Sequence, residues 1–144
     1  MTRLDRTTVW RRLQVIRRDV ELLAPEADIS LATYLADHLK RAGIERVLQT
    51  ATEATLDIRK HLLRVNGLPR PEKAHDVVVA VGAAGFIPVP LAEALAPATG
   101  LRNRLVHEYD DLDDAVVHAS IPDTLRLLPQ FAAAVERYLD DPTR

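Results

Sequence analysis

Residues 101–109 read Leu-Arg-Asn-Arg-Leu-Val-His-Glu-Tyr, and reactive polar side chains gather there in a stretch otherwise suited to burial. His107 can take or give a proton, because the ordinary pKa of histidine is about 6.5. Arg102 stays charged and can hold two phosphate oxygens as negative charge develops on them. Asn103 can orient the imidazole or a substrate. Such a set supports phosphodiester transfer within RNA, in which the 2′-hydroxyl attacks the adjacent phosphorus and no metal is needed.

These side chains do not share one helix face. At about 100° per residue, Asn103 and His107 lie one turn apart on the same side, and Arg102 and Tyr109 share a neighbouring stripe. Arg102 and His107 are about 140° apart by the same geometry. The long arginine side chain, or a second subunit, must therefore bring both groups to one phosphate.

Taken singly, each residue also has an ordinary structural explanation. A lone histidine in an apolar helix is most often a satisfied structural residue, and a lone tyrosine is most often a core aromatic. The combination favours a site, with Tyr109 in a regulatory or site role. Arg104 either helps to bind phosphate or pairs with Glu108 one turn later, and we favour the pairing slightly.

Composition predicts one domain, spanning 1–144, with a core of Leu, Val, Ile and Ala. The chain is 47% hydrophobic but only 4% aromatic, which suits packed helices. It has no cysteine, which excludes disulfides, thiol catalysis and Cys-ligated zinc. The net charge of −2 argues against a protein that coats nucleic acid, and it weakens a pure RNA-binding function more than an enzymatic one.

Two further absences shape the expectation. No apolar run approaches the roughly 20 residues that span a bilayer, and the chain does not start like a signal peptide, so we expect a cytoplasmic protein with no membrane partner. Four histidines outside the reactive segment show no ligand spacing, so we expect no metal and no other cofactor. They are His38, His61, His75 and His118.

Apolar periodicity predicts the elements that must hold the reactive segment. A first helix has apolar residues alternately four and three apart, and Pro25 ends it. Its buried stripe is Val9, Leu13, Ile16, Val20 and Leu23. The opposite face is interpreted as solvated rather than as an RNA-binding stripe. It carries Arg11, Arg12, Arg17, Arg18 and Asp19.

A short helical stretch over 30–36 precedes the longest helix, which runs to about Val65 and ends at Asn66 and Gly67. Its apolar seam consists of Ile44, Val47, Ala51, Ile58, Leu62 and Val65. The stretch 73–84 has strong β-propensity, but a lone strand has nothing to pair with. Gly85 also fits a helix C-cap, so we predict a helix there.

The remaining helices contain and follow the reactive segment. One begins near Pro90 and is kinked or restarts near Pro97. It carries Leu91, Leu95, Leu101, Leu105 and Tyr109. The final helix has Pro122 near its start and Pro129 at a bend. Its buried face is Leu125, Leu128, Phe131, Val135 and Leu139. The acids before His118 are interpreted as a solvated loop and helix start, and the elements together predict an all-α protein.

Glu53 and Asp57 are four residues apart on the longest helix, so their carboxylates share a face. One interpretation is an exposed acidic edge. The alternative is a supporting role, in which an ion pair steers Arg102.

The chain resembles a known family closely. Arg102, His107 and Tyr109 match the R-x4-H-x-Y signature of the HepT-like toxins, a branch of the HEPN ribonucleases, and Gly100 is in register with their Gly-Phe-Arg-Asn-x-Leu-Val-His-x-Tyr segment. Residues 45–49, Glu-Arg-Val-Leu-Gln, and 53–58, Glu-Ala-Thr-Leu-Asp-Ile, are similar to the family's long-helix pattern. The departures are the prolines, which fall where the family runs continuous helices. They are Pro97, Pro122 and Pro129.

This resemblance implies an all-α, up-and-down bundle of four to five helices that forms a homodimer, with the two Arg–His motifs facing a shared cleft. It implies metal-independent cleavage of an RNA substrate. It also implies a partner, a minimal nucleotidyltransferase antitoxin that silences the toxin by adding AMP to the motif tyrosine, here Tyr109. An anionic nucleotide beside Arg102 would occupy the phosphate site and repel RNA.

Two other functions stay open at this point. A non-catalytic helical adaptor, or a substrate-presenting subunit of a nucleotidyltransferase, would bind such a partner without cutting RNA. A purely structural four-helix dimerisation module would leave the polar run at 102–109 unexplained and ranks last.

Overall fold

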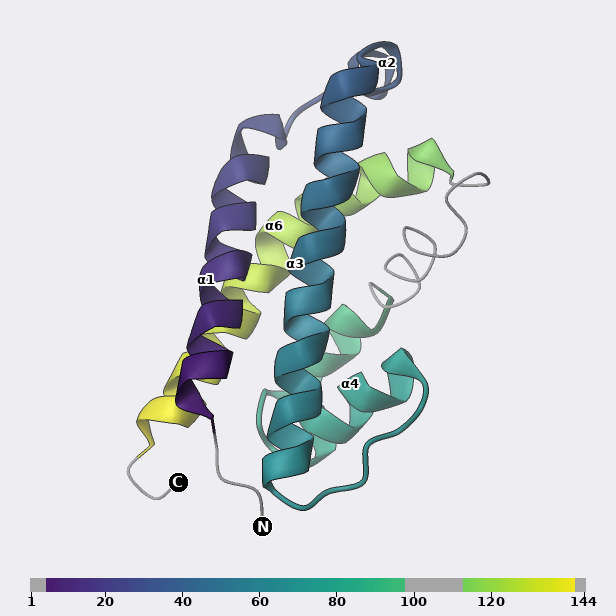
Figure 1. Cartoon of the computed structure of the whole chain (residues 1–144). Coiled ribbons are helices and arrows are strands. Elements are labelled where there is room, and N and C mark those ends of the chain that lie inside the picture. Colours follow the sequence, from purple (N-terminus) through teal and green to yellow (C-terminus); the bar gives the residue numbers. More distant parts are fainter. Residues whose placement is uncertain (1–4, 98–112, 142–144) are drawn as a thin grey trace.

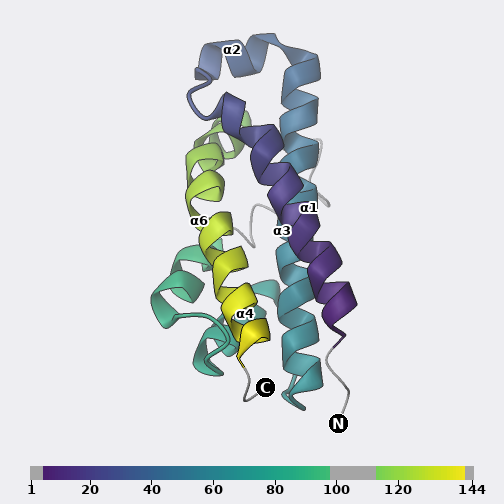
Figure 2. The same ribbon diagram turned by 90° about the vertical axis from the view of Figure 1, so that its left-hand side faces the viewer.

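Three long helices form the body of the molecule. The computed structural model describes residues 5–97 and 113–141. Helix α1 spans Arg6–Leu23, α3 spans His38–Val65 and α6 spans Asp114–Asp140, and the short α2 spans Leu31–Ala36. Figures 1 and 2 show α1 antiparallel to α3, with α6 crossing the pair from the α2 end to the opposite end. The expected all-α fold is confirmed, and the described residues contain no β-strand.

Helix α1 follows its predicted pattern. Its apolar stripe is buried, apart from Val20, which is partly exposed. Asp5 caps the helix by accepting a hydrogen bond from the Thr8 backbone N–H at 3.0 Å. A 3-10 turn over Ala24–Glu26 follows, with Pro25 at its start. Ser30 then caps α2 by accepting from the Thr33 N–H at 3.1 Å, so the short helix predicted there is confirmed.

The prediction that Asp19 lies on the solvated face of α1 is wrong. Its side chain is only 1% exposed, and it accepts hydrogen bonds from the Thr50 hydroxyl on α3 and from Arg18. Helix α3 covers this edge of α1, and the hydroxyl compensates the carboxylate for lost water. Apolar periodicity locates the centre of a buried face but not how far a neighbouring helix reaches over its edge.

Two glycines end helices as predicted. Gly67 has φ 67°, and the Leu68 N–H donates to the Leu63 carbonyl at 2.9 Å, which closes α3. Helix α4 spans Ala74–Ala83, so the helix predicted over 73–84 is confirmed. Gly85 has φ 82°, and a matching bond from the residue after it reaches back to α4. Glycine adopts this left-handed conformation without strain, so both sequences stop their helices.

Helix α6 begins earlier than predicted. Asp114 is its first residue, so Pro122 lies inside the helix and not near its start, and Pro129 lies further along. Both prolines are exposed, so the carbonyls that lose a backbone partner face water. The buried Val117 and Ile121 hold the extra turns against the bundle, which explains why the helix persists upstream of Pro122.

The buried apolar residues form two cores. The smaller one, named here the α2-end core, lies where α2 meets the long helices. It consists of Leu23, Tyr34, Ile44, Leu48, Val117 and Ile121. The larger one, named here the main core, joins α1, α3, α4, α6 and the helical residues 89–97. None of the helices in the described part of the chain is long and apolar enough to span a bilayer.

Candidate active site

The residues predicted to carry the chemistry lie outside the described part of the chain. They are Arg102, Asn103, Arg104, His107 and Tyr109. The structure describes the chain up to Pro97 and again from Asp113. These two flanks set where the intervening segment leaves the described fold and where it rejoins it.

The upstream flank is packed tightly against α4. Residues 89–97 are helical, and Leu91, Ala92 and Leu95 are buried in the main core. A Cβ added to Gly82 of α4 would lie 2.7 Å from the Ala92 Cβ, closer than two carbon atoms can approach. The glycine therefore permits a contact that fixes the upstream flank on α4.

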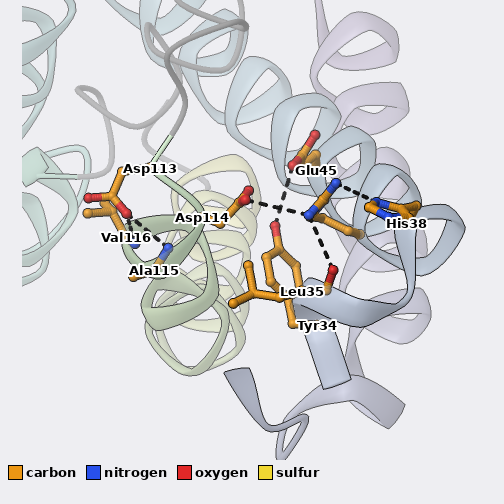
Figure 3. A network of polar contacts seen from close by, with 9 residues as sticks. Tyr34, Leu35, His38, Glu45, Asp113, Asp114, Ala115 and Val116 are labelled. Carbon is orange, nitrogen blue, oxygen red and sulfur yellow. Dashed lines mark hydrogen bonds and ion pairs between the residues drawn. The ribbon is translucent and has the colours of Figure 1, made fainter. Parts of the chain in front are cut away.

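The downstream flank is fixed at the α2 end of the bundle. Asp113 caps α6, since its Oδ1 accepts from the Ala115 N–H at 3.0 Å. The next residue, Asp114, forms an ion pair with Arg41 of α3, with 3.5 Å between Nη1 and Oδ2. Figure 3 shows Asp114 pointing toward Glu45 and the α2–α3 corner, while Asp113 points along its own helix start. The first turn of α6 is thus tied to α3.

A polar network continues from this ion pair into the α2-end core. Arg41 also donates to the Leu35 carbonyl at 3.4 Å and contacts the His38 ring at 2.7 Å. Tyr34 is fully buried, and its hydroxyl donates to Glu45 at 3.5 Å (Figure 3). One arginine therefore links α2, α3 and α6 beside a buried phenol and carboxylate.

Burial sets the protonation of this network. It raises the pKa of Glu45, and the negative charge of Asp114 raises it further while Arg41 opposes the change. Burial, followed by the charge of Glu45, also raises the pKa of Tyr34, so the phenol stays neutral and acts as a donor. The sequence does not predict this network, because the acids before His118 indicate only a solvated loop and helix start.

Glu53 and Asp57 lie on α3, as predicted. The contacts that the structure describes for them are with Gln49 and Arg12. The Asp57 carboxylate is 3.3 Å from Arg12 Nε of α1, with both side chains about half exposed. Glu53 accepts a hydrogen bond from Gln49 at 3.3 Å. The predicted ion pair with Arg102 involves a residue outside the described part, so it stays a prediction. Among the described residues, no three His, Asp or Glu side chains could together hold a metal ion.

Arg59 is a buried cation that the sequence interpretation missed. It is 3% exposed, and it donates to the carbonyl and the hydroxyl of Thr55 on its own helix. Its guanidinium lies over the Phe131 ring of α6, 5.8 Å from the centroid, and Nη1 has no hydrogen-bond partner among the residues that the structure describes. Burial lowers the pKa of Arg59 to about 10. Its spacing from Thr55, one turn away within an apolar stretch, was the available signal.

The sequence of this chain is similar to those of known ribonucleases. A family model described as Ribonuclease HepT-like matches residues 13–135. The tRNA nuclease HepT of Aphanizomenon flos-aquae is 33% identical over 139 residues, which cover 96% of this chain and 95% of that protein. The mRNA nuclease HepT of Shewanella oneidensis is 38% identical over 72 residues, covering 49% of this chain and 54% of that protein.

Comparison by structure gives the same fold. A tri-AMPylated Shewanella oneidensis HEPN toxin, solved in complex with an MNT antitoxin, matches with a TM-score of 0.78. The match covers 90% of this chain and 97% of that one, at 23% identity. The fold that positions the two flanks is therefore also the fold of that toxin.

Proposed function

This chain belongs to the HepT-like ribonuclease family and is an endoribonuclease, and we propose that it cuts RNA without a metal, as the toxin of a toxin–antitoxin pair. The observation that carries the proposal is the motif Arg102, His107 and Tyr109, at the spacing R-x4-H-x-Y, in a chain of this family. Two relatives named as nucleases of tRNA and mRNA support RNA as the substrate.

In the proposed reaction, the ribose 2′-oxygen bonds to the adjacent phosphorus while the bond from phosphorus to the 5′-oxygen breaks. His107 takes the proton of the 2′-hydroxyl or gives one to the departing 5′-oxygen. Arg102 holds the non-bridging oxygens as their charge grows. Asn103 orients the imidazole or the substrate. The products are a cyclic phosphate and a 5′-hydroxyl, and the step needs no further reactant.

A homodimer is part of the proposal, because Arg102 and His107 are about 140° apart on a regular helix. A second copy facing the first supplies the missing group to each phosphate site. Within one copy, the described flanks hold both sides of the motif segment, because Leu91 and Leu95 pack in the main core and Asp113 caps α6. Glu53, Asp57 and Arg104 have supporting roles in the proposal, by charge and not by taking part in the reaction.

The proposed partner is a minimal nucleotidyltransferase antitoxin that adds AMP to Tyr109. A similar toxin has been solved in its tri-AMPylated form with an MNT antitoxin, which supports this part of the proposal. AMP would place a negative phosphate beside Arg102 and compete with the RNA backbone. Intact-mass measurement after coexpression with such an antitoxin should show gains of whole AMP units, and Tyr109→Phe should abolish them.

The activity test is cleavage of total tRNA and of mRNA transcripts in excess EDTA. We expect cleavage with cyclic-phosphate ends, and a loss of at least about 100-fold in rate for His107→Ala and for Arg102→Ala. The matched controls are His75→Ala, at an exposed histidine of α4, and Arg126→Ala, at an exposed arginine of α6. Undiminished cleavage by either motif variant would refute the assignment. No cleavage by the parent, together with tight binding to the nucleotidyltransferase, would favour the adaptor function.

A further inference from the structure

A half-exposed tryptophan opens a groove between α1 and α6. Trp10 is the sole tryptophan of the chain and its side chain is 50% exposed. It lines a groove of about 560 Å³, within the roughly 300–1,000 Å³ of clefts that take small ligands. The groove residues are Arg6, Thr7, Trp10, Arg17, Glu136, Leu139 and Asp140. It lies at the end of the bundle where α1 begins and α6 finishes, shown in purple and yellow in Figure 1.

The helix that carries this tryptophan concentrates positive charge. Helix α1 contains five arginines, all exposed. They are Arg6, Arg11, Arg12, Arg17 and Arg18. Its two acidic residues are Asp19, which is buried, and Glu21. The exposed side chains of α1 therefore include five arginines and one acid, although the net charge of the chain is −2. A local excess of arginine on one helix is the electrostatic signature of a phosphate-binding face.

Three of these arginines form ion pairs with described residues. Arg12 pairs with Asp57, Arg17 with Glu136 and Arg18 with Asp19. Within the described part of the chain, neither Arg6 nor Arg11 has an ion-pair partner. Arg6 lies one turn before Trp10 on the groove side, and Arg11 lies on the outward side of the same helix. By helix geometry, Arg6 and Arg11 therefore lie to either side of Trp10, with Arg6 in the groove lining and Arg11 outside it.

The indole of Trp10 already has a guanidinium stacked on it. The Arg17 guanidinium lies over the indole of Trp10, 5.5 Å from the ring centroid, and its ion pair with Glu136 fixes it there. Asp140 at the rim is exposed and has no ion-pair partner among the described residues. Its carboxylate can accept hydrogen bonds from the amino and imino groups of a base edge.

We propose that this groove binds an unpaired nucleotide of the RNA substrate, with its base stacked on Trp10 and its flanking phosphates on Arg6 and Arg11. The proposal rests on the proposed ribonuclease function and adds a substrate contact outside the Arg–His motif. It revises the interpretation of this helix face as merely solvated. Unpaired RNA is recognised through stacked bases and backbone charge, and the face supplies an aromatic ring and arginines together.

A protein partner fits the same face less well. A protein interface of this kind would bury aromatic and apolar groups at its centre and keep charges at its rim. Here the large exposed apolar group of the groove is one ring, Trp10, since Leu139 is buried, and the rest of the lining is polar or charged: Arg6, Arg17, Thr7, Glu136 and Asp140. An RNA strand can stack a base on the ring and place phosphates on the unpaired arginines.

The test uses His107→Ala as the parent, so that RNA is bound and not cut. A fluorescein-labelled 12-nucleotide single-stranded RNA is titrated by anisotropy, and unlabelled RNA by quenching of the single tryptophan. We expect saturable quenching in the parent. Trp10→Leu should weaken binding roughly tenfold, and Trp10→Phe, which keeps a stacking face, should weaken it less. Thermal unfolding of each variant checks that α1 stays folded.

Salt dependence tests the phosphate contacts separately. Arg6→Ala and Arg11→Ala should each reduce the slope of log K against log salt by about 0.7, while Trp10→Leu should leave the slope unchanged. The controls are Arg126→Ala, at an exposed paired arginine, and Val79→Ala, at an apolar side chain of α4 that is 52% exposed. Neither control should change affinity by more than about twofold.

Two results would overturn the inference. One is unchanged RNA affinity by anisotropy in Trp10→Leu, Arg6→Ala and Arg11→Ala while the parent binds RNA. The other is loss of association with a second copy or with the antitoxin in Trp10→Leu while RNA binding is retained, which would assign the groove to a protein. Neither result affects the proposed activity, which fails only if the chain with its native His107 does not cut RNA.

Discussion

Two regions of the described structure that hold buried ionisable side chains, the α2 end and the main core, treat them in opposite ways. At the α2 end, Arg41 joins Asp114 of α6 to α3, next to the buried carboxylate of Glu45. In the main core, the described hydrogen bonds of Arg59 go to Thr55 on its own helix, and one of its nitrogens has no hydrogen-bond partner within the described ranges. Contacts between helices restrict how the helices sit, whereas contacts inside one helix cannot.

This difference suggests that one region fixes the position of a helix and the other sets the stability of the fold. The α2-end network holds the first turn of α6, which follows the motif segment directly in the chain. The main core holds the upstream flank through apolar packing of Leu91 and Leu95, and we expect the buried charge of Arg59 to reduce the stability of that core. Substitutions in the main core should therefore change mainly the free energy of unfolding, and those at the α2 end mainly its pH dependence and helix coupling.

The largest effect is expected at Phe131, which is fully buried and lies beneath the Arg59 guanidinium. Phe131→Ala should lower the free energy of unfolding by about 3–5 kcal/mol, because it leaves a cavity and removes the ring that covers the cation. Urea denaturation measures it, with Phe131→Leu as the control that keeps most of the volume. A loss below about 1 kcal/mol would show that the main core does not depend on this ring.

Arg59→Met should change stability in the opposite direction. The lowered pKa of about 10 means that the folded state disfavours the charged guanidinium, and methionine keeps a long apolar stem. We expect a gain of roughly 1–3 kcal/mol by urea denaturation. The gain should be constant between about pH 5 and 8, because a base with a lowered folded pKa recovers stability only as pH rises through that value. A loss of about 3 kcal/mol or more would mean that Arg59 is paired outside the described residues.

Much of the fold could be predicted from apolar spacing and glycine stops. The stripe of α1 and the ends of α3 and α4 follow from local rules, since a helix face and a left-handed glycine are properties of short segments. The start of α6 could not, because Pro122 suggests a boundary and only the packing of Val117 and Ile121 outweighs it. Asp19 was missed for the same reason, since its burial depends on α3.

The candidate site divides in the same way. The motif Arg102, His107 and Tyr109 could be recognised because its residues are close in sequence. The network around Arg41 could not, because it joins residues far apart in the chain whose meeting depends on the bundle. The burial of Arg59 could not be predicted either, because this polar residue lies beside an apolar seam and has no charge partner among the described residues.

Glu45→Gln tests whether the α2-end network makes the stability of the protein depend on pH. The pKa of Glu45 is raised above its ordinary value of 4.5, so the folded state disfavours its charged form at neutral pH. Its contribution to stability therefore grows as pH falls from 7 toward that ordinary value. We expect the amide to raise stability at pH 7 by roughly 0.5 kcal/mol and to remove this dependence. The exposed Glu21→Gln is the control, and a difference between parent and Glu45→Gln that is flat across this range would contradict the prediction.

The last effect, of a size similar to that of Glu45→Gln, is the coupling between Arg41 and Asp114, measured by a double-mutant cycle of their alanine variants. The two side chains are 25% and 32% exposed, so we expect about 0.5–1 kcal/mol, near the top of the range for partly exposed pairs. The pair Arg126 and Asp123 is the control, since it lies within α6 at 60% and 65% exposure and should couple by less. If the pair between helices positions α6, Arg41→Ala should also slow RNA cleavage although it leaves the motif intact. Equal coupling in both pairs, with unchanged cleavage, would mean that joining helices gives this ion pair no advantage over one inside a single helix.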